Sequence, residues 1–326
     1  MANINSRRVL FEKFSNQLHL LKKEGIINIE LKYEKTYICP ICLDQFSIDD
    51  IISSDTKNFL TEEDAPPDKL GGSRIALTCK RCNSTAGHEI DAHLINRIRM
   101  IDNGRFYPGT THEGTVEFEG KNIQTEITSD GDGKLQLLHR FKNNNPTFLD
   151  KFINNINQNV GKFLNLKQKR LKNDSEKVNK ALLKTSYILT FAKFGYIFLL
   201  DEYYNNIRKE ISDTNTAYSG HVFLAEQFNP TQLGTYYILN KNAESIFNVF
   251  SLETKYSQTI IGNILPLRKV KPEEIYNHLT VKGYKIGVPD SIGVTLNVST
   301  YDKDADLFND MEEINRVLNW YKSFHS

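Results

Sequence analysis

The sequence predicts an α+β protein, in which a small N-terminal module leads into a larger mixed α+β C-terminal domain. Three observations support this prediction. Apolar residues recur at three- and four-residue steps in several stretches, which indicates helices. Other stretches alternate apolar and polar residues, which indicates strands. All four cysteines of the chain lie between Cys39 and Cys82, and this clustering sets the N-terminal module apart from the rest.

The composition is that of an ordinary globular protein. Of the 326 residues, 39% are hydrophobic and 25% are charged, and this length allows two compact domains. The formal net charge is only +1, so binding to nucleic acid would have to come from local basic patches. The most apolar stretch, residues 184–201, is interrupted by Lys193. We therefore expect a buried helix there and no membrane association. The first residues lack a signal peptide's apolar core, so we expect a cytoplasmic protein.

Residues 1–36 are expected to form an amphipathic helix and a strand. Apolar side chains follow helical spacing over residues 8–23, and Gly25 ends this helix. Residues 26–33 have the composition of a strand and lead into the first cysteine pair. The pattern is helical again from Asn83 to about Ile101, so a module over residues 37–101 ends in a helix.

Residues 102–144 are expected to form a small antiparallel β region, because short alternating stretches flank the strong turn signal at residues 130–133. Residues 145–326 would continue as a helical region, broken near residues 172–174, and end as an α+β domain. The strand candidates of this last part are His221–Ala225, Thr235–Leu239, Ile246–Leu252, Thr259–Pro266 and Val294–Val298, and its closing helix is Leu307–Tyr321.

The cysteines form two Cys-x-x-Cys pairs, Cys39 with Cys42 and Cys79 with Cys82. This spacing is typical of a closed tetrahedral zinc site, in which four thiolates leave no position for a substrate. We therefore predict one structural zinc ion. Two disulfides would suit a secreted protein instead. A RING finger would need further Cys or His ligands between the pairs, and residues 43–78 contain none.

Between the two cysteine pairs, Glu63 is followed by Asp64, by Pro67 and by the pair Gly71–Gly72, and Asn83 directly follows the last cysteine. Together with the cysteines, this pattern over about residues 37–100 resembles the zinc-stabilised form of the HNH endonuclease family. In that family an acidic residue precedes a catalytic histidine, a proline and two glycines follow at these offsets, and a final Asn or His binds metal. Here Asp64 occupies the histidine position.

The resemblance implies a β-hairpin followed by a helix, the ββα-metal fold, around one Mg²⁺ or Mn²⁺ ion that promotes hydrolysis of a phosphodiester bond. It implies that Glu63 and Asn83 bind this cation, and that Asp64 acts in catalysis with His88 as a further candidate. The basic residues expected to contact phosphates, of DNA rather than RNA, are Lys80, Arg81, Arg97 and Arg99. We therefore predict a metal-dependent nuclease that resembles bacterial restriction or antiphage effectors.

Replacement of the histidine leaves three alternatives. An aspartate with an ordinary pKa of about 3.9 is a weak base at neutral pH, so Asp64 could instead bind the metal beside Glu63. His88 or His93, on the following helix, could supply the imidazole. The module could also be catalytically inactive and bind nucleic acid or another protein. The asparagine that the family often carries before the second cysteine pair is absent from residues 73–78.

The C-terminal domain would select the substrate, regulate the nuclease, hold a small ligand, or form a homo-oligomer or a partner interface. Its residues identify no ligand.

Overall fold

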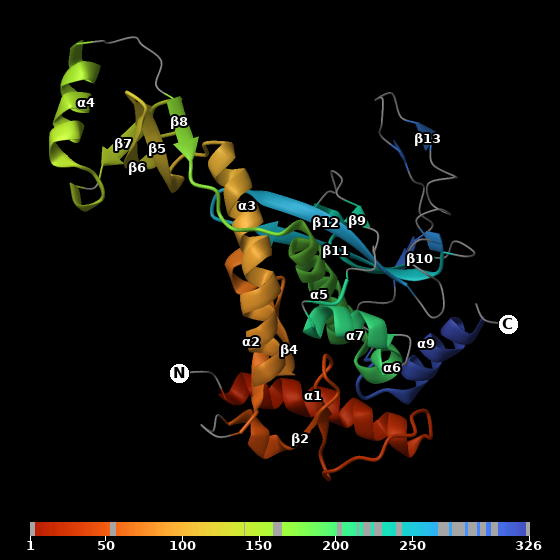
Figure 1. Cartoon of the computed structure of the whole chain (residues 1–326). Coiled ribbons are helices and arrows are strands. Elements are labelled where there is room, and N and C mark those ends of the chain that lie inside the picture. The colour runs from red at the N-terminus through yellow and green to blue at the C-terminus, as the bar shows by residue number, and fades with distance from the viewer. Residues whose placement is uncertain are drawn as a thin grey trace. The chain divides into compact units, whose positions relative to one another are not determined.

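The computed structural model describes residues 4–52, 57–139, 141–158, 165–200, 204–213, 215–217, 223–224, 230–238, 243–266, 274–275, 284–285, 292–293, 298–300 and 306–323 (Figure 1). The fold is mixed α+β, with helices and small antiparallel sheets. The chain forms two compact units. The first contains Met1–Leu94, Asp174–Thr254 and Gln258–Ser326, and the second contains Ile95–Asn173 and Lys255–Ser257. None of the described helices is both long enough and apolar enough to cross a bilayer.

The first unit opens with helix α1 (Ile4–Lys23), which confirms the predicted N-terminal helix and starts one turn earlier. Its buried face carries Phe14, which stacks on Phe191 with ring centroids 4.4 Å apart. Residues 26–33 do not form the predicted strand. The side chain of Gln45 binds the backbone of Glu30 and Lys32 there, so these groups are satisfied without a neighbouring strand.

Two hairpins and a helical run build the region that contains the cysteines. Strand β1 (Tyr37–Ile38) pairs with β2 (Gln45–Phe46), and β3 (Leu60–Ala65) pairs antiparallel with β4 (Ser73–Cys79). The helical run follows β4 directly and consists of α2 (Lys80–Ala86), the π-helical turn η3 (Gly87–Asp91) and α3 (Ala92–Gly104). Two short 3-10 turns, η1 (Ile48–Ile51) and η2 (Asp68–Leu70), lie before and within the second hairpin. The order of hairpin and helix is therefore ββα.

Helix α5 (Ser175–Phe194) packs at the centre of the first unit, and most of its side chains are buried. Asp174 caps its N-terminus by accepting hydrogen bonds from the backbone of Glu176 and Lys177. The hydroxyl of Tyr187 donates to Pro40 O, which ties α5 to the first cysteine turn. Further helices of this unit are α6 (Tyr196–Leu199), α7 (Asn205–Ser212) and α9 (Met311–Ser323).

A five-stranded antiparallel sheet completes the first unit, in the order β15-β10-β11-β12-β9. Its strands are β9 (Phe223–Leu224), β10 (Gly234–Ile238), β11 (Ser245–Glu253), β12 (Gln258–Pro266) and β15 (Val298–Thr300), and a small separate pair is β13 (Tyr284–Lys285) with β14 (Ile292–Gly293). The three predicted strands at 235–239, 246–252 and 259–266 are confirmed, and the predicted closing helix is α9. The predictions at 221–225 and 294–298 fall largely outside the described residues.

The second unit contains a four-stranded antiparallel sheet, helix α4 (Pro146–Gln158) and most of α3. The strands are β5 (Thr111–Phe118), β6 (Lys121–Ser129), β7 (Leu135–His139) and β8 (Asn165–Gln168), in the order β7-β6-β5-β8. Strand β8 lies where a continuous helical region was predicted, so that prediction was wrong. Residues 165–168 pair with β5, with Leu166 opposite Val116. This pairing across the sheet overrides the weak local preference of the segment.

Candidate metal centre

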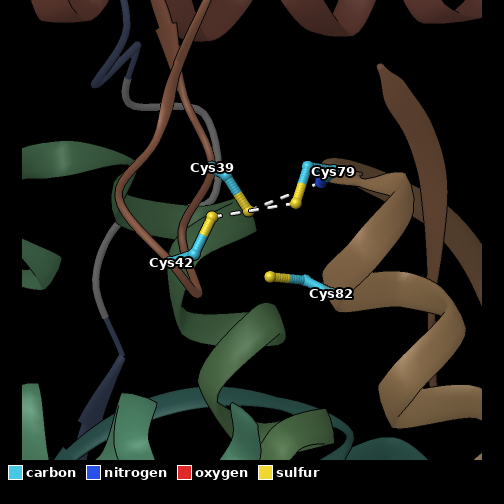
Figure 2. A group of neighbouring side chains, drawn as sticks. All are labelled: Cys39, Cys42, Cys79 and Cys82. Carbon is cyan, nitrogen blue, oxygen red and sulfur yellow. Dashed lines mark hydrogen bonds between the residues drawn. The ribbon is translucent and has the colours of Figure 1, made fainter. Parts of the chain in front are cut away.

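The four cysteine side chains converge on one point (Figure 2). All four Sγ atoms lie within 4.8 Å of one another. Cys39 and Cys42 belong to the turn that begins after β1, whereas Cys79 ends β4 and Cys82 lies in the first turn of α2. Three of the thiols are buried and Cys42 is half-buried. The two sequence pairs therefore form a single cluster.

The distances fit one metal ion and do not fit disulfides. Cys42 Sγ lies 3.7 Å from Cys79 Sγ, whereas a disulfide needs about 2.05 Å. Four sulfurs placed about 2.3 Å from a tetrahedral zinc ion would lie about 3.8 Å apart. The backbone N–H of Cys79 also donates to Cys39 Sγ at 3.4 Å. The four cysteines are thus close enough together to bind a metal ion such as zinc.

Local backbone contacts position both cysteine pairs. The Cys39 N–H donates to Asp44 O, and the Leu43 N–H returns to Cys39 O with Leu43 in a left-handed conformation at φ 62°. At the other pair, the Lys80 N–H donates to Phe59 O, which fixes the start of α2 against the entry to β3. Hydrogen bonding with the Cys39 thiol lowers the pKa of Cys79, whereas burial raises the pKa of Cys39.

Glu63 lies on the buried face of β3, with only 2% of its surface exposed. Its Oε1 accepts a hydrogen bond from Lys184 Nζ at 2.7 Å, and its Oε2 accepts one from Thr78 Oγ1 at 2.7 Å. Lys184 belongs to α5, 121 residues away along the chain. Both oxygens of the expected cation ligand therefore bind donors that the protein itself supplies.

Lys184 also binds a second carboxylate. Its Nζ lies 2.6 Å from Asp91 Oδ2, in turn η3. Burial disfavours the ammonium, but Glu63 and Asp91 outweigh this effect and raise the pKa of Lys184, so it stays charged. Asp91 Oδ1 is buried and has no hydrogen-bond partner within the described part of the chain. Burial raises the pKa of Asp91.

Asp64 has different surroundings from Glu63, although the two are adjacent in sequence. The register of the β3–β4 hairpin shifts between them, and Asp64 is half-buried rather than buried. Burial, together with repulsion from Asp68, raises the pKa of Asp64 to about 6, while Arg74 lowers it in part. Its carboxylate is therefore a stronger base than an ordinary aspartate.

The other expected site residues are spread over the helical run. Asn83 Nδ2 donates to Thr61 Oγ1 at 3.0 Å and to Glu62 O at 2.8 Å, so its amide ties the first turn of α2 to β3. His88 is exposed in η3. His93 is buried, and its Nδ1 accepts a hydrogen bond from the Asp174 N–H at 2.9 Å. His93 thus helps to hold the start of α5.

Within the ranges described, the cysteines are the one group of three or more Cys, His, Asp or Glu side chains with the spacing of a metal site. The expected cation ligands Glu63 and Asn83 do not belong to such a group, and each carries the hydrogen bonds given above.

The four basic residues expected to contact phosphates are exposed. Lys80 and Arg81 belong to α2, and Arg97 and Arg99 belong to α3. Arg81 Nη2 lies 2.9 Å from Asp44 Oδ2, but both side chains are largely exposed. Such an exposed pair contributes little to stability, so Arg81 can exchange Asp44 for another anion.

Sequence reasoning missed the partners of Glu63. Thr78 directly precedes a cysteine, Asp91 lies two residues before His93, and Lys184 begins the apolar stretch 184–201. Helical spacing places Lys184 on the buried side of α5, and buried lysines are almost always paired. This position was the signal that Lys184 has an acidic partner. Its partner could not be found from periodicity.

Comparison with family models, with curated proteins and with solved structures found no match to this chain.

Proposed function

We propose that this chain is a zinc-stabilised nucleic-acid-binding protein whose HNH-like module does not bind a hydrolytic cation at Glu63. One observation carries the second part of the proposal: Lys184 Nζ and Thr78 Oγ1 already bind the two oxygens of that carboxylate. A divalent cation at Glu63 would have to displace a buried ammonium group. Removing one partner of such a buried pair is costly, by about 3–5 kcal/mol.

The contacts of Asn83 support the same proposal. Its two hydrogen bonds attach α2 to β3, and Cys79 and Cys82 of the cysteine cluster lie where β4 meets α2. The module therefore has the means to keep a rigid ββα frame. A rigid frame suits the recognition of a phosphate backbone as well as it suits catalysis.

Nucleic acid is the proposed partner because Lys80 and Arg81 are exposed at the start of the helix that follows the hairpin. Lysine and arginine contacts to phosphates release counterions, so the logarithm of the affinity falls linearly with the logarithm of the salt concentration. On duplex DNA each contact steepens this slope by about 0.9. A chain with net charge +1 depends on such local contacts.

The test is the salt dependence of binding to fluorescent duplex DNA, single-stranded DNA and RNA, measured by anisotropy. The double variant Lys80→Gln, Arg81→Gln should bind more weakly. For duplex DNA, the slope of log affinity against log salt should become shallower by about 1.8, the value for two phosphate contacts. Lys22→Gln removes an exposed lysine of α1 and should leave the binding unchanged. Absence of binding to all three probes at low salt would reject nucleic acid and leave protein interaction as the function of the module.

Hydrolysis of a phosphodiester bond is a second candidate function, and Asp64 is the observation that favours it. Asp64 occupies the position of the general base in the HNH family. It is half-buried, so part of its side chain is open to solvent, and its pKa is raised to about 6. A base with a pKa near neutrality can accept a proton from water at physiological pH. Mg²⁺ or Mn²⁺ bound at this site would supply a polarised water and neutralise charge on the phosphate.

A plasmid digestion series separates the two functions. Cleavage that needs Mg²⁺ or Mn²⁺ and is abolished by Asp64→Asn would establish the hydrolytic function. Glu63→Gln tests the expected metal ligand in the same assay, and His88→Ala tests the alternative imidazole. Binding without cleavage under every metal condition would leave the non-hydrolytic function in place.

A further inference from the structure

The ammonium group of Lys184 contacts two carboxylates, as a bound metal ion would. Its Nζ lies 2.7 Å from Glu63 Oε1 and 2.6 Å from Asp91 Oδ2. The Lys184 and Glu63 side chains are only 1% and 2% exposed. One carboxylate from the second hairpin and one from turn η3 thus contact the same ammonium group, which belongs to helix α5.

The charges of this cluster are not balanced by the lysine. With both carboxylates ionised the cluster would carry a net charge of −1, and burial together with repulsion from Glu63 raises the pKa of Asp91. The buried Asp91 Oδ1 lacks a hydrogen-bond partner among the described residues. Two carboxylates and one divalent cation would carry no net charge. The unpartnered oxygen is therefore a donor atom that a divalent cation could use and that the ammonium leaves unused.

We propose that the ammonium group of Lys184 takes the place of a divalent cation in this module, and that Glu63 and Asp91 bind such a cation when Lys184 is removed. This proposal rests on one part of the proposed function, namely that Glu63 binds no hydrolytic cation in the wild-type protein. It does not depend on nucleic acid.

Size favours Ca²⁺ over Mg²⁺ as the probe. The two Nζ–O distances of 2.7 and 2.6 Å are close to Ca²⁺–O distances of about 2.3–2.6 Å and longer than Mg²⁺–O distances of about 2.0–2.1 Å. Ca²⁺ also accepts irregular geometry, whereas Mg²⁺ requires a near-ideal octahedron. Truncation of Lys184 to alanine would leave space for the ion and its remaining water ligands.

The experiment is a calorimetric titration of the full chain with CaCl₂, followed by thermal melts with and without Ca²⁺. Lys184→Ala should bind one Ca²⁺ with a dissociation constant on the order of 10⁻⁴–10⁻³ M, as expected for a site with few ligands. Its melting temperature should rise with Ca²⁺. Wild type should show no binding in this range, and Mg²⁺ should bind Lys184→Ala more weakly than Ca²⁺.

Lys180→Ala is the matched control. Lys180 is also buried on α5, and its Nζ contacts Thr216 O and the carboxylate of Glu176. Its removal should create no Ca²⁺ site. Adding Glu63→Gln to Lys184→Ala should weaken Ca²⁺ binding at least tenfold, because one of the two carboxylates is lost.

A folded Lys184→Ala variant that binds no Ca²⁺ overturns the proposal, since Lys184 would then be only a structural ion-pair partner. If Lys184→Ala folds only when Ca²⁺ is present, the proposal is supported. If it folds under neither condition, the double variant with Glu63→Gln decides. That variant should fold without Ca²⁺, because only one of the two unpaired carboxylates, that of Asp91, then remains, and its failure to fold would also overturn the proposal. Loss of nucleic-acid binding alone would affect only the proposed function.

Discussion

Thr78 Oγ1 on β4 lies 2.7 Å from Glu63 Oε2 on β3, so the second hairpin contains a buried side-chain hydrogen bond in addition to its backbone ladder. Thr78 is fully buried. With Lys184 on the other oxygen, the carboxylate has a donor on each side. This arrangement makes Glu63 part of the packing of the hairpin.

Thr78→Val should therefore destabilise the protein, because the valine keeps the shape of threonine but removes the donor to Glu63 Oε2. We expect a loss of about 1–3 kcal/mol in the free energy of unfolding, measured by urea denaturation. Thr259→Val, at a half-buried position in β12, is the matched control and should cost less. Equal losses for the two variants would show that the Thr78 hydrogen bond adds nothing specific.

Gly72 should tolerate no side chain. A Cβ added there would lie 1.5 Å from the carbonyl oxygen of Pro66, closer than any non-bonded contact. Gly72→Ala must therefore open the turn between β3 and β4, and we expect a loss of about 3 kcal/mol or more.

Gly87→Ala is the control for Gly72→Ala. Gly87 has helical backbone angles, and among the described residues beyond its own helical turn no atom lies within 4 Å of an added Cβ. This substitution should leave thermal stability unchanged or raise it by up to about 1 kcal/mol. A Gly72→Ala variant as stable as Gly87→Ala would contradict the turn geometry described here.

The purified protein should contain one zinc ion per chain, measured by elemental analysis. Cys82→Ser and Cys42→Ser, one from each pair, should both lose the metal, because a closed four-thiolate site needs every ligand. A strong chelator should release the zinc and unfold the region around the second hairpin, since metal binding and folding are coupled in such sites. Full folding of the metal-free protein would argue against a structural metal.

Asp174 should give α5 a pH-dependent cap. Hydrogen bonds from the backbone N–H groups of Lys177 and Glu176 lower the pKa of Asp174. A group with a lowered folded pKa stabilises the protein above its unfolded pKa of about 3.9, and this stabilisation is lost as the pH falls through the folded value.

Asp174→Ala should cost about 1 kcal/mol at neutral pH. Asp174→Asn retains a side-chain oxygen as acceptor and should cost less, while it removes the acid-dependent part. Urea denaturation at neutral and acidic pH measures both effects. An unchanged acid dependence in Asp174→Asn would show that Asp174 does not contribute to it.

Some features followed from local sequence alone. The N-terminal helix could be predicted because its apolar residues repeat with the helical period, and three strands of the large sheet could be predicted because their patterns are long. The cysteine cluster followed from spacing, since each Cys-x-x-Cys pair is typical of a zinc site and the two pairs together supply four thiols.

Other features depended on partners that are remote in the chain. Residues 26–33 have strand-like composition but bind the Gln45 side chain, and residues 165–168 have no strong preference but pair with β5. In both places the backbone hydrogen bonds were decided by what lay beside the segment. The local amino-acid composition of a segment does not predict which remote segment will lie beside it.

By itself, the sequence determined that four thiols would form one cluster, because the spacing within each Cys-x-x-Cys pair is a local property. Only the tertiary structure decided what Glu63 binds. That choice depends on α5 bringing Lys184 to the carboxylate from 121 residues away. Because both side chains are buried, each charge needs the other as its partner.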